Sequence, residues 1–285
     1  MSVVIAIDAG TTGVRAVAID EHGSAVGFSY REFEQHFPRP GWVEHDASEI
    51  WTTVQTTLAE LAGTLDQPIA AVGITDQRET IVAWDRRTGR PLHRAIVWQD
   101  RRTAARCDEL RLQGHEPLVR AATGLVLDPY FSATKAEWLL HEGGVEASVD
   151  LALGTVDAWV LWNLTGGSSG GTFATEPSNA SRTMLFDIRE MRWSTELLEL
   201  FGVPASALPE VMPSSGRLGV TVDGCGLPAG IPVSGMAGDQ QAALFGQACH
   251  EPGLAKNTYG TGNFLLQNAG TGSPLLEQGL ITTIA

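Results

Sequence analysis

The chain has 285 residues, of which 43% are hydrophobic and 18% are charged, and its formal net charge is −14. This length and composition are those of a globular protein with one large or two medium domains. The acidic balance argues against nucleic acid or an anionic membrane surface as the main partner, because both repel a negatively charged chain. It still permits nucleotide binding, which needs only a local cradle for the phosphates.

Three widely spaced cysteines, Cys107, Cys225 and Cys249, form no Cys-x-x-Cys pattern. We therefore expect neither a disulfide framework nor a zinc site. The N-terminus lacks the charged region of a signal peptide, and no apolar run reaches the length of a membrane-spanning helix. The sequence thus predicts a cytoplasmic protein without a membrane span.

Residues 3–20 consist of two β-branched apolar runs around the segment Asp-Ala-Gly-Thr-Thr-Gly, which is typical of a β-hairpin. The two glycines permit a tight turn in which N–H groups and the hydroxyls of Thr11 and Thr12 face one anion. Asp8 ends the first strand, where a carboxylate can hold a hydrated metal, and Arg15 lies on the second. No Gly-x-x-x-x-Gly-Lys-Ser/Thr motif is present. The segment fits either a phosphate hairpin of the actin-like ATPase type or an ordinary N-terminal hairpin.

The rest of the chain alternates between predicted strands and helices. Asp46 and Glu49 form a capping pattern before apolar residues at helical spacing, which predicts a helix over residues 47–62. Further strands are predicted at 25–33, 69–75, 80–85 and 96–98, and further helices from Asp100, at 133–142, at 156–164 and at 195–201. We assign Arg101 and Arg102 to the solvated surface of the helix that opens at Asp100. This alternation indicates an α/β layered fold.

Residues 256–266 repeat the opening pattern, with a Gly-Thr-Gly turn between two strands. The actin-like fold places two similar domains across a nucleotide cleft, and each contributes one such loop. The sequence therefore predicts an α/β actin-like ATPase (ribonuclease H-like) domain at residues 1–250. Residues 251–285 are predicted to be the opening hairpin of a second such domain that is cut short.

Seven long and irregular segments give the sequence a specific resemblance. They are GITDQRET at 73–80, AIVWQDRRT at 95–103, AGDQQAALFGQ at 237–247, PGWVEHD at 40–46, DPYFSATK at 128–135, SNASRT at 178–183 and TYGTG at 258–262. Together they resemble the glycerol kinases, which belong to the FGGY carbohydrate kinase family. The resemblance covers essentially the whole chain.

The resemblance implies transfer of the γ-phosphate of ATP to glycerol, giving sn-glycerol 3-phosphate, with ATP and Mg²⁺ as cofactors and a homo-oligomer in the complete enzyme. The implied phosphate-binding residues are Thr11, Thr12, Gly13, Arg15, Thr261 and Gly262. The implied glycerol-binding residues are Arg78, Glu79, Tyr130, Asp239 and Gln240, with Trp98 and Phe264 as apolar walls. Asp239 matches the catalytic base, and Asp8 would hold Mg²⁺ through water.

The chemistry of these side chains suits a small polyol. Arg78 can only donate hydrogen bonds and Glu79 can only accept them, so the pair can fix a pattern of hydroxyl groups. Asp239 would accept the proton of the attacking hydroxyl, although an aspartate at a helix start is more often a cap. Trp98 and Phe264 are residue types found more often in a core than in a substrate wall.

Two departures and two alternatives remain. The first loop reads Thr-Thr-Gly-Val-Arg where glycerol kinases usually have Thr-Thr-Ser-Ser-Arg, and Glu176-Pro177 follows Thr175 where they tend to have Thr-Asp.

The alternatives are a kinase for another short polyol or ketose and a non-catalytic actin-like fragment that binds a polyol. With one domain incomplete, we expect the chain alone to be inactive. Unpaired strand edges at 256–266 and 279–284 would favour association or a disordered tail.

Overall fold

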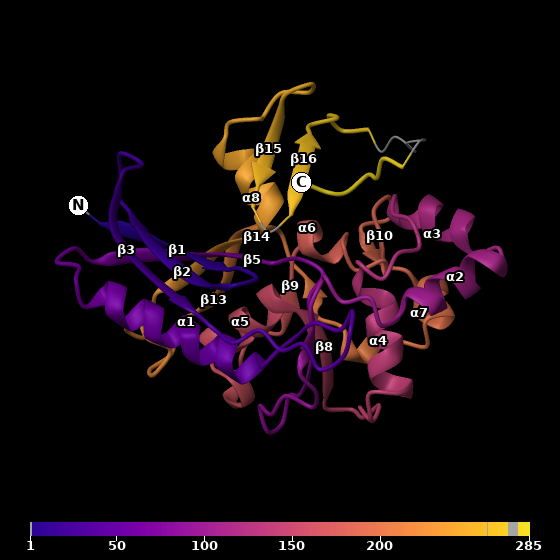
Figure 1. Ribbon diagram of the computed structural model, residues 1–285. Coiled ribbons are helices and arrows are strands. Elements are labelled where there is room, and N and C mark those ends of the chain that lie inside the picture. The colour runs from indigo at the N-terminus through magenta and orange to yellow at the C-terminus, as the bar shows by residue number, and fades with distance from the viewer. Residues whose placement is uncertain (1, 261, 273–278) are drawn as a thin grey trace.

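A six-stranded sheet forms the centre of the computed structural model, which describes residues 2–260, 262–272 and 279–285 (Figure 1). The strand order is β13 (Ser215–Val220), β14 (Pro232–Gly238), β5 (Ile69–Asp76), β1 (Val3–Ala9), β2 (Gly13–Ile19) and β3 (Ala25–Glu32). Strand β5 runs parallel to both β1 and β14, and the other pairs are antiparallel. The three parallel strands therefore end at one edge of the sheet.

Helix α1 (Ala47–Ala62) covers one face of this sheet. Its predicted bounds are confirmed, and Asp46 caps it by accepting a hydrogen bond from the N–H of Ser48 at 2.8 Å. The second half of the predicted capping box is absent among the described contacts, since Glu49 instead accepts from the N–H of Glu34 at 3.1 Å. Alternate residues of β1, such as Ile5, are fully buried beneath the helix.

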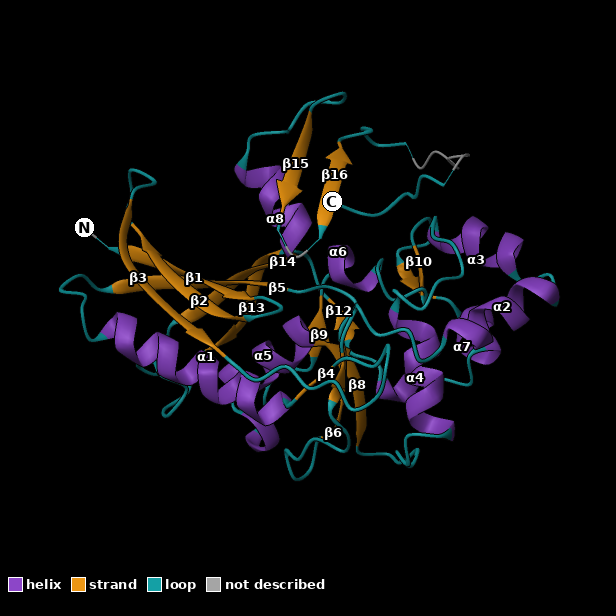
Figure 2. Ribbon diagram, in the orientation of Figure 1, coloured by secondary structure: helices purple, strands orange, loops and turns teal. Residues whose placement is uncertain are grey.

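A second, antiparallel sheet has the order β4 (Glu44–His45), β7 (Ala95–Ile96), β6 (Ile81–Asp85) and β8 (Leu151–Thr155). Helix α5 (Val156–Leu164) packs between the two sheets and is buried on almost every side. At the end of the molecule far from the N-terminus lie α2 (Ala104–Leu112), α3 (Glu116–Thr123), α4 (Ser132–His141) and α7 (Thr195–Leu200) (Figure 2).

Short elements complete this region. They are η1 (Gly167–Ser169), β9 (Ala174–Thr175), α6 (Pro177–Ala180), β10 (Phe186–Asp187), β11 (Arg192–Trp193), η2 (Ala205–Ala207) and β12 (Glu210–Val211). Helix α8 (Asp239–Gly246) follows β14 directly and carries the chain to a hairpin of β15 (Ala255–Tyr259) and β16 (Asn263–Gln267). This hairpin stands above α8 in Figure 1. The predicted second hairpin is thus confirmed.

The fold corrects three predictions. The predicted helix at Asp100 begins only at Ala104, and Arg102 is not solvated: its side chain is 0% exposed and bonds to Asp100 and Glu44 at 2.8 Å. Arg101 is exposed, as predicted. Residues 279–284 form no strand, because this segment instead lies along the domain, with the N–H of Thr282 bonded to the carbonyl of Gly124 at 3.0 Å.

Among the described residues, no helix combines the length and apolar character needed to cross a membrane.

Candidate active site

The site lies where the three parallel strands of the central sheet end. The turn after β1 supplies the first glycine-rich loop, the turn after β5 supplies Arg78 and Glu79, and the end of β14 leads directly into Asp239. Such strand ends are the usual binding edge of an open α/β sheet. A cavity of about 490 Å³ opens there, and its lining includes the predicted residues Asp8, Thr11, Arg15, Arg78, Glu79, Trp98, Tyr130, Asp239, Gln240, Gly262 and Phe264.

Among the described residues, two of the predicted ones are not part of this lining. Thr12 is exposed, with its hydroxyl 3.4 Å from that of Tyr30. Gly13 is buried against β3, where a Cβ would lie 2.3 Å from the carbonyl oxygen of Arg31. The glycine is therefore required by the close approach of two backbones. Thr261 lies outside the described residues.

Arg78 and Asp239 form an ion pair inside the cavity. Arg78 Nε lies 2.9 Å from Asp239 Oδ1, and the Arg78 side chain is 3% exposed. A Cβ on Gly238 would lie 2.5 Å from Arg78 Cδ, so the glycine lets the arginine cross the start of α8. Burial raises the pKa of Asp239, and the positive charge of Arg78 partly opposes this rise. The cavity therefore disfavours the charged form of this carboxyl group relative to water, and Arg78 partly offsets that cost.

Glu79 is fixed by residues from two distant parts of the chain, the segment after α6 and the start of α4. Its backbone adopts a φ of +64°, which non-glycine residues rarely do. Arg182 Nε donates to Glu79 Oε1 at 2.6 Å, and the Ser132 hydroxyl donates to the Glu79 carbonyl at 3.0 Å. Arg182 was not among the predicted site residues, although its segment, SNASRT, was one of the matching motifs. Its partner is 103 residues away in sequence, and only the fold brings the two together.

Aromatic rings wall the other side of the cavity. The centroid of the Trp98 ring lies 5.6 Å from that of Tyr130 and 6.1 Å from that of Phe264. The Arg78 guanidinium lies 5.7 Å from the Phe264 ring centroid. Burial raises the pKa of Tyr130, so its phenol remains a neutral hydrogen-bonding group. Trp98 and Phe264 therefore add aromatic surface to the cavity, with Phe264 next to the Arg78 guanidinium.

The amide of Gln240 is engaged at both ends. Its Nε2 donates to Asp239 Oδ2 at 2.9 Å, and its Oε1 accepts a hydrogen bond from Lys256. Because an ammonium group can only donate, Lys256 requires the amide oxygen on its side and so directs the NH₂ group toward Asp239. Lys256, which sequence reasoning missed, is 3% exposed and also bonds to Thr258 at 2.8 Å.

Asp8 faces the cavity beside the first loop. Its carboxylate lies 3.9 Å from Arg15, and burial raises its pKa, while Arg15 opposes the rise. No group of three or more His, Cys, Asp or Glu residues in the described part of the chain could enclose a metal ion. A single carboxylate beside a phosphate loop fits Mg²⁺, which keeps several waters and needs only one or two carboxylates.

The central mixed sheet, the two Gly-Thr hairpins and a cavity at the strand ends define an α/β domain of the actin-like ATPase type. Residues 3–246 match the model of the FGGY family of carbohydrate kinases, N-terminal domain. The chain belongs to this family.

Relatives and solved structures agree with this assignment. The chain is 53% identical over 289 aligned residues to a glycerol kinase of Carboxydothermus hydrogenoformans, covering 99% of this chain and 57% of that protein. It is similar to the crystal structure of Plasmodium falciparum glycerol kinase with ADP, with a TM-score of 0.95 and 35% identity, covering 100% of this chain and 57% of the other. A gluconate kinase from Lactobacillus acidophilus has a TM-score of 0.85 at 19% identity, over 93% of this chain and 53% of the other, and therefore shows the fold alone. The chain thus spans little more than half the length of these proteins.

Proposed function

We propose that this chain is the polyol-binding and first phosphate-binding part of an ATP-dependent glycerol kinase. One observation carries the proposal. The buried Arg78 and Glu79 and the half-buried Asp239 share a single cavity with the glycine-rich loop at Thr11 and with the aromatic ring of Trp98. A small polyol bound among the charged groups would lie beside the loop that would hold the phosphate.

The residues take complementary roles in this reaction. Arg78 would donate to the glycerol hydroxyls, Glu79 and the Tyr130 phenol would accept or share their protons, and Trp98 and Phe264 would cover the C–H side. Asp239 would take the proton of the attacking hydroxyl, with Gln240 holding its second oxygen. Since phosphoryl transfer has a loose transition state, positioning and charge neutralisation contribute more than base strength.

The phosphates would meet donors from both hairpins. The first loop would contribute Thr11, Thr12, Gly13 and Arg15, and the second Thr261 and Gly262. Asp8 would hold Mg²⁺ through water, and the ion would neutralise charge on the phosphates. A domain boundary near residue 250, a cytoplasmic location and a homo-oligomeric complete enzyme belong to the same proposal.

Glycerol titration of the chain tests the proposal. We expect glycerol to shift the NMR signals of Arg78 and of the Trp98 indole, and 1,2-propanediol, which lacks one hydroxyl, to bind about 5- to 150-fold more weakly. A site built to pair hydroxyls leaves buried polar groups unpaired when one is missing. Absence of any glycerol shift in the folded chain, or tighter binding of a ketose such as xylulose, would contradict the proposal.

A further inference from the structure

The carbonyl groups of the first phosphate loop all face the protein. Each carbonyl of residues 9–13 accepts a hydrogen bond. Three of the donors are backbone N–H groups. The other two are side-chain amides: Gln77 Nε2 donates to the Gly10 carbonyl at 2.9 Å, and Gln35 Nε2 donates to the Thr11 carbonyl at 2.8 Å.

These two side-chain bonds determine where the next two N–H groups point. In a trans peptide the N–H of one residue points away from the carbonyl of the residue before it. Drawing the Gly10 carbonyl inward therefore turns the N–H of Thr11 outward, and drawing the Thr11 carbonyl inward does the same for Thr12. In the described part of the chain, neither of these N–H groups has a hydrogen-bond acceptor. Two donors are left to face an anion.

His45 connects the two amides. Its Nε2 lies 2.7 Å from Gln35 Oε1, and its Nδ1 lies 3.2 Å from Gln77 Nε2. Since Gln77 Nε2 can only donate, Nδ1 must accept and Nε2 must carry the proton. Burial, and next the proximity of His36, lower the pKa of His45 to about 3, so the imidazole stays neutral. The bonds then run in one direction, from Gln77 through His45 and Gln35 to the Thr11 carbonyl.

The opposite side of the loop is held by the substrate wall. Trp98 Nε1 donates to the Thr11 hydroxyl oxygen at 2.9 Å. The Trp98 backbone N–H donates to the Thr80 hydroxyl at 3.2 Å, which in turn donates to Gln77 Oε1 at 2.9 Å. With its oxygen engaged by an indole that can only donate, the Thr11 hydroxyl keeps its own proton available for an anion.

We propose that Gln35, His45 and Gln77 form a brace that positions the phosphate loop by turning the N–H groups of Thr11 and Thr12 toward the bound phosphate. This inference rests on the proposed function, because it takes the loop to be a phosphate site. The three side chains are positioning residues. Gln35 and Gln77 bond to the loop carbonyls, and His45 acts through these two amides. Gln77 also lines the cavity, whereas Gln35 and His45 are not part of its lining. They come from three places in the sequence, namely the segment after β3, strand β4 and the turn after β5.

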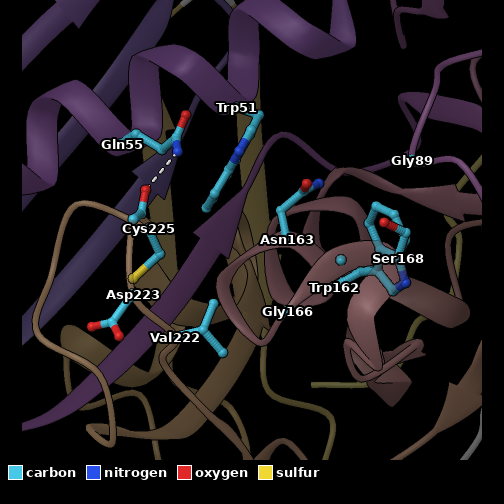
Figure 3. Close-up of a pocket in the computed structure, with 12 residues that line it drawn as sticks. Trp51, Gln55, Gly89, Trp162, Asn163, Gly166, Ser168, Val222, Asp223 and Cys225 are labelled. Atoms are coloured by element: carbon cyan, nitrogen blue, oxygen red, sulfur yellow. Dashed lines mark hydrogen bonds between the residues drawn. The ribbon is translucent and has the colours of Figure 1, made fainter.

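The test compares two amides that make the same kind of bond. Gln35→Met removes the donor to the Thr11 carbonyl without adding charge. Gln55→Met is the matched control, because Gln55 is also half-buried and its Nε2 donates to the Gly224 carbonyl at 2.7 Å (Figure 3). Gln55 lines a separate cavity of about 260 Å³ between α1 and the loop at residues 222–225. Inorganic pyrophosphate is the probe, and amide NMR signals of residues 10–13 are the readout.

We expect Gln35→Met to shift the loop amide signals of the free chain and to weaken pyrophosphate binding about three- to tenfold. Glycerol affinity and the melting temperature should stay near those of the unaltered chain. A merely structural role of Gln35 would instead lower the melting temperature and weaken both ligands together. Gln55→Met should change none of these. The inference is overturned if Gln35→Met leaves the loop signals and pyrophosphate affinity unchanged, if Gln55→Met has the same effect, or if pyrophosphate does not shift the loop of the unaltered chain. Failure of the proposed function would appear separately, as absent glycerol shifts at Arg78 and Trp98.

Discussion

The two Gly-Thr hairpins of this chain share a local pattern and differ in what supports them. Strands β1 and β2 lie inside a six-stranded sheet, flanked by β5 and β3 and covered by α1. Within the described residues, β15 and β16 pair only with each other and rest on α8. Ile7 on β1 is fully buried, whereas the Leu265 side chain on β16 is 73% exposed. Local sequence therefore forms a hairpin, but neighbouring elements decide how firmly its loop is held.

Adding the part of a longer relative that would pack against the second hairpin should have the largest effect, and the effect is on turnover. We compare the 285-residue chain with a chimera that continues into the remaining part of the Carboxydothermus hydrogenoformans glycerol kinase, which is longer than this chain. The chain alone should show glycerol-dependent ADP release at least about 10³-fold slower than the chimera, because losing even one fixed donor to a transition state costs about 10²–10³-fold. Comparable turnover in both would mean that the second hairpin needs no further support.

Asp239 lies at the junction between the two hairpins, at the start of α8. In the chimera, Asp239→Asn should keep glycerol binding and lower turnover about 10²–10⁴-fold, because the amide retains the shape but cannot take a proton. Asp223→Asn, an exposed carboxylate elsewhere, is the control. Near-normal turnover of the Asp239 variant would assign proton transfer to another group.

Acid should lower the free energy of unfolding of the chain by protonating His45, whose amide partners bond to the loop of the first hairpin. Its pKa is lowered to about 3 in the folded chain, below the ordinary value of about 6.5. The unfolded chain therefore binds a proton that the folded chain excludes, so the stability is complete above about pH 6.5 and is lost as the pH falls toward 3. At about 1.4 kcal/mol per pKa unit, the loss has an upper limit of about 5 kcal/mol.

Denaturant unfolding between pH 7 and pH 4 measures this loss. His45→Gln removes the titrating group but keeps one acceptor and one donor. Its stability should therefore fall less with acid than that of the unaltered chain. His22→Gln, at an exposed position, should leave the acid dependence unchanged. Parallel curves for all three proteins would show that His45 does not carry the effect.

Arg78 connects the start of α8 with the second hairpin, since it pairs with Asp239 and lies against the Phe264 ring of β16. Arg78→Ala should weaken glycerol binding by about 1–3 kcal/mol, the cost of leaving a buried polar partner unpaired. The exposed Arg101, whose ion pair with Asp128 is 3.1 Å long, provides the control substitution Arg101→Ala. Calorimetric titration of both variants with glycerol decides whether the effect is specific to the cavity.

Patterns that depend on nearby residues were predictable from the sequence. The helix at 47–62 and the hairpins follow from capping residues, apolar spacing and glycine turns, all within one element. The matching motifs also identified most of the side chains that line the cavity. Residues held by distant partners were missed. Arg102 reads as a surface arginine, yet its guanidinium lies 3.8 Å from the Trp42 ring centroid and 4.5 Å from that of Trp138.

The same limit explains Arg182 and His45. Nothing next to Arg182 in sequence indicates that Glu79 is its partner, and nothing next to His45 indicates Gln77. His45 meets Gln77 where the second sheet lies against the end of β5, and Arg182 reaches Glu79 from the segment after α6. Both arrangements depend on the packing of the whole domain. A buried arginine or histidine can be recognised only when the elements that surround it are known.

The smallest expected effect tests the contrast in burial directly. Leu265→Ala should change the free energy of unfolding of the chain by no more than about 0.5 kcal/mol, since most of the side chain is already in water. The corresponding change on the first hairpin, Ile7→Ala, removes fully buried methyl groups and should cost about 2–5 kcal/mol. Both costs are measured by urea unfolding. The slope of the unfolding free energy against urea concentration should be the same for both variants, which would show that they unfold from equally compact states. Equal costs would mean that β16 is buried in solution and that the two hairpins are equally supported. Unequal costs in the expected order would confirm that similar hairpins differ in stability because of what packs against them.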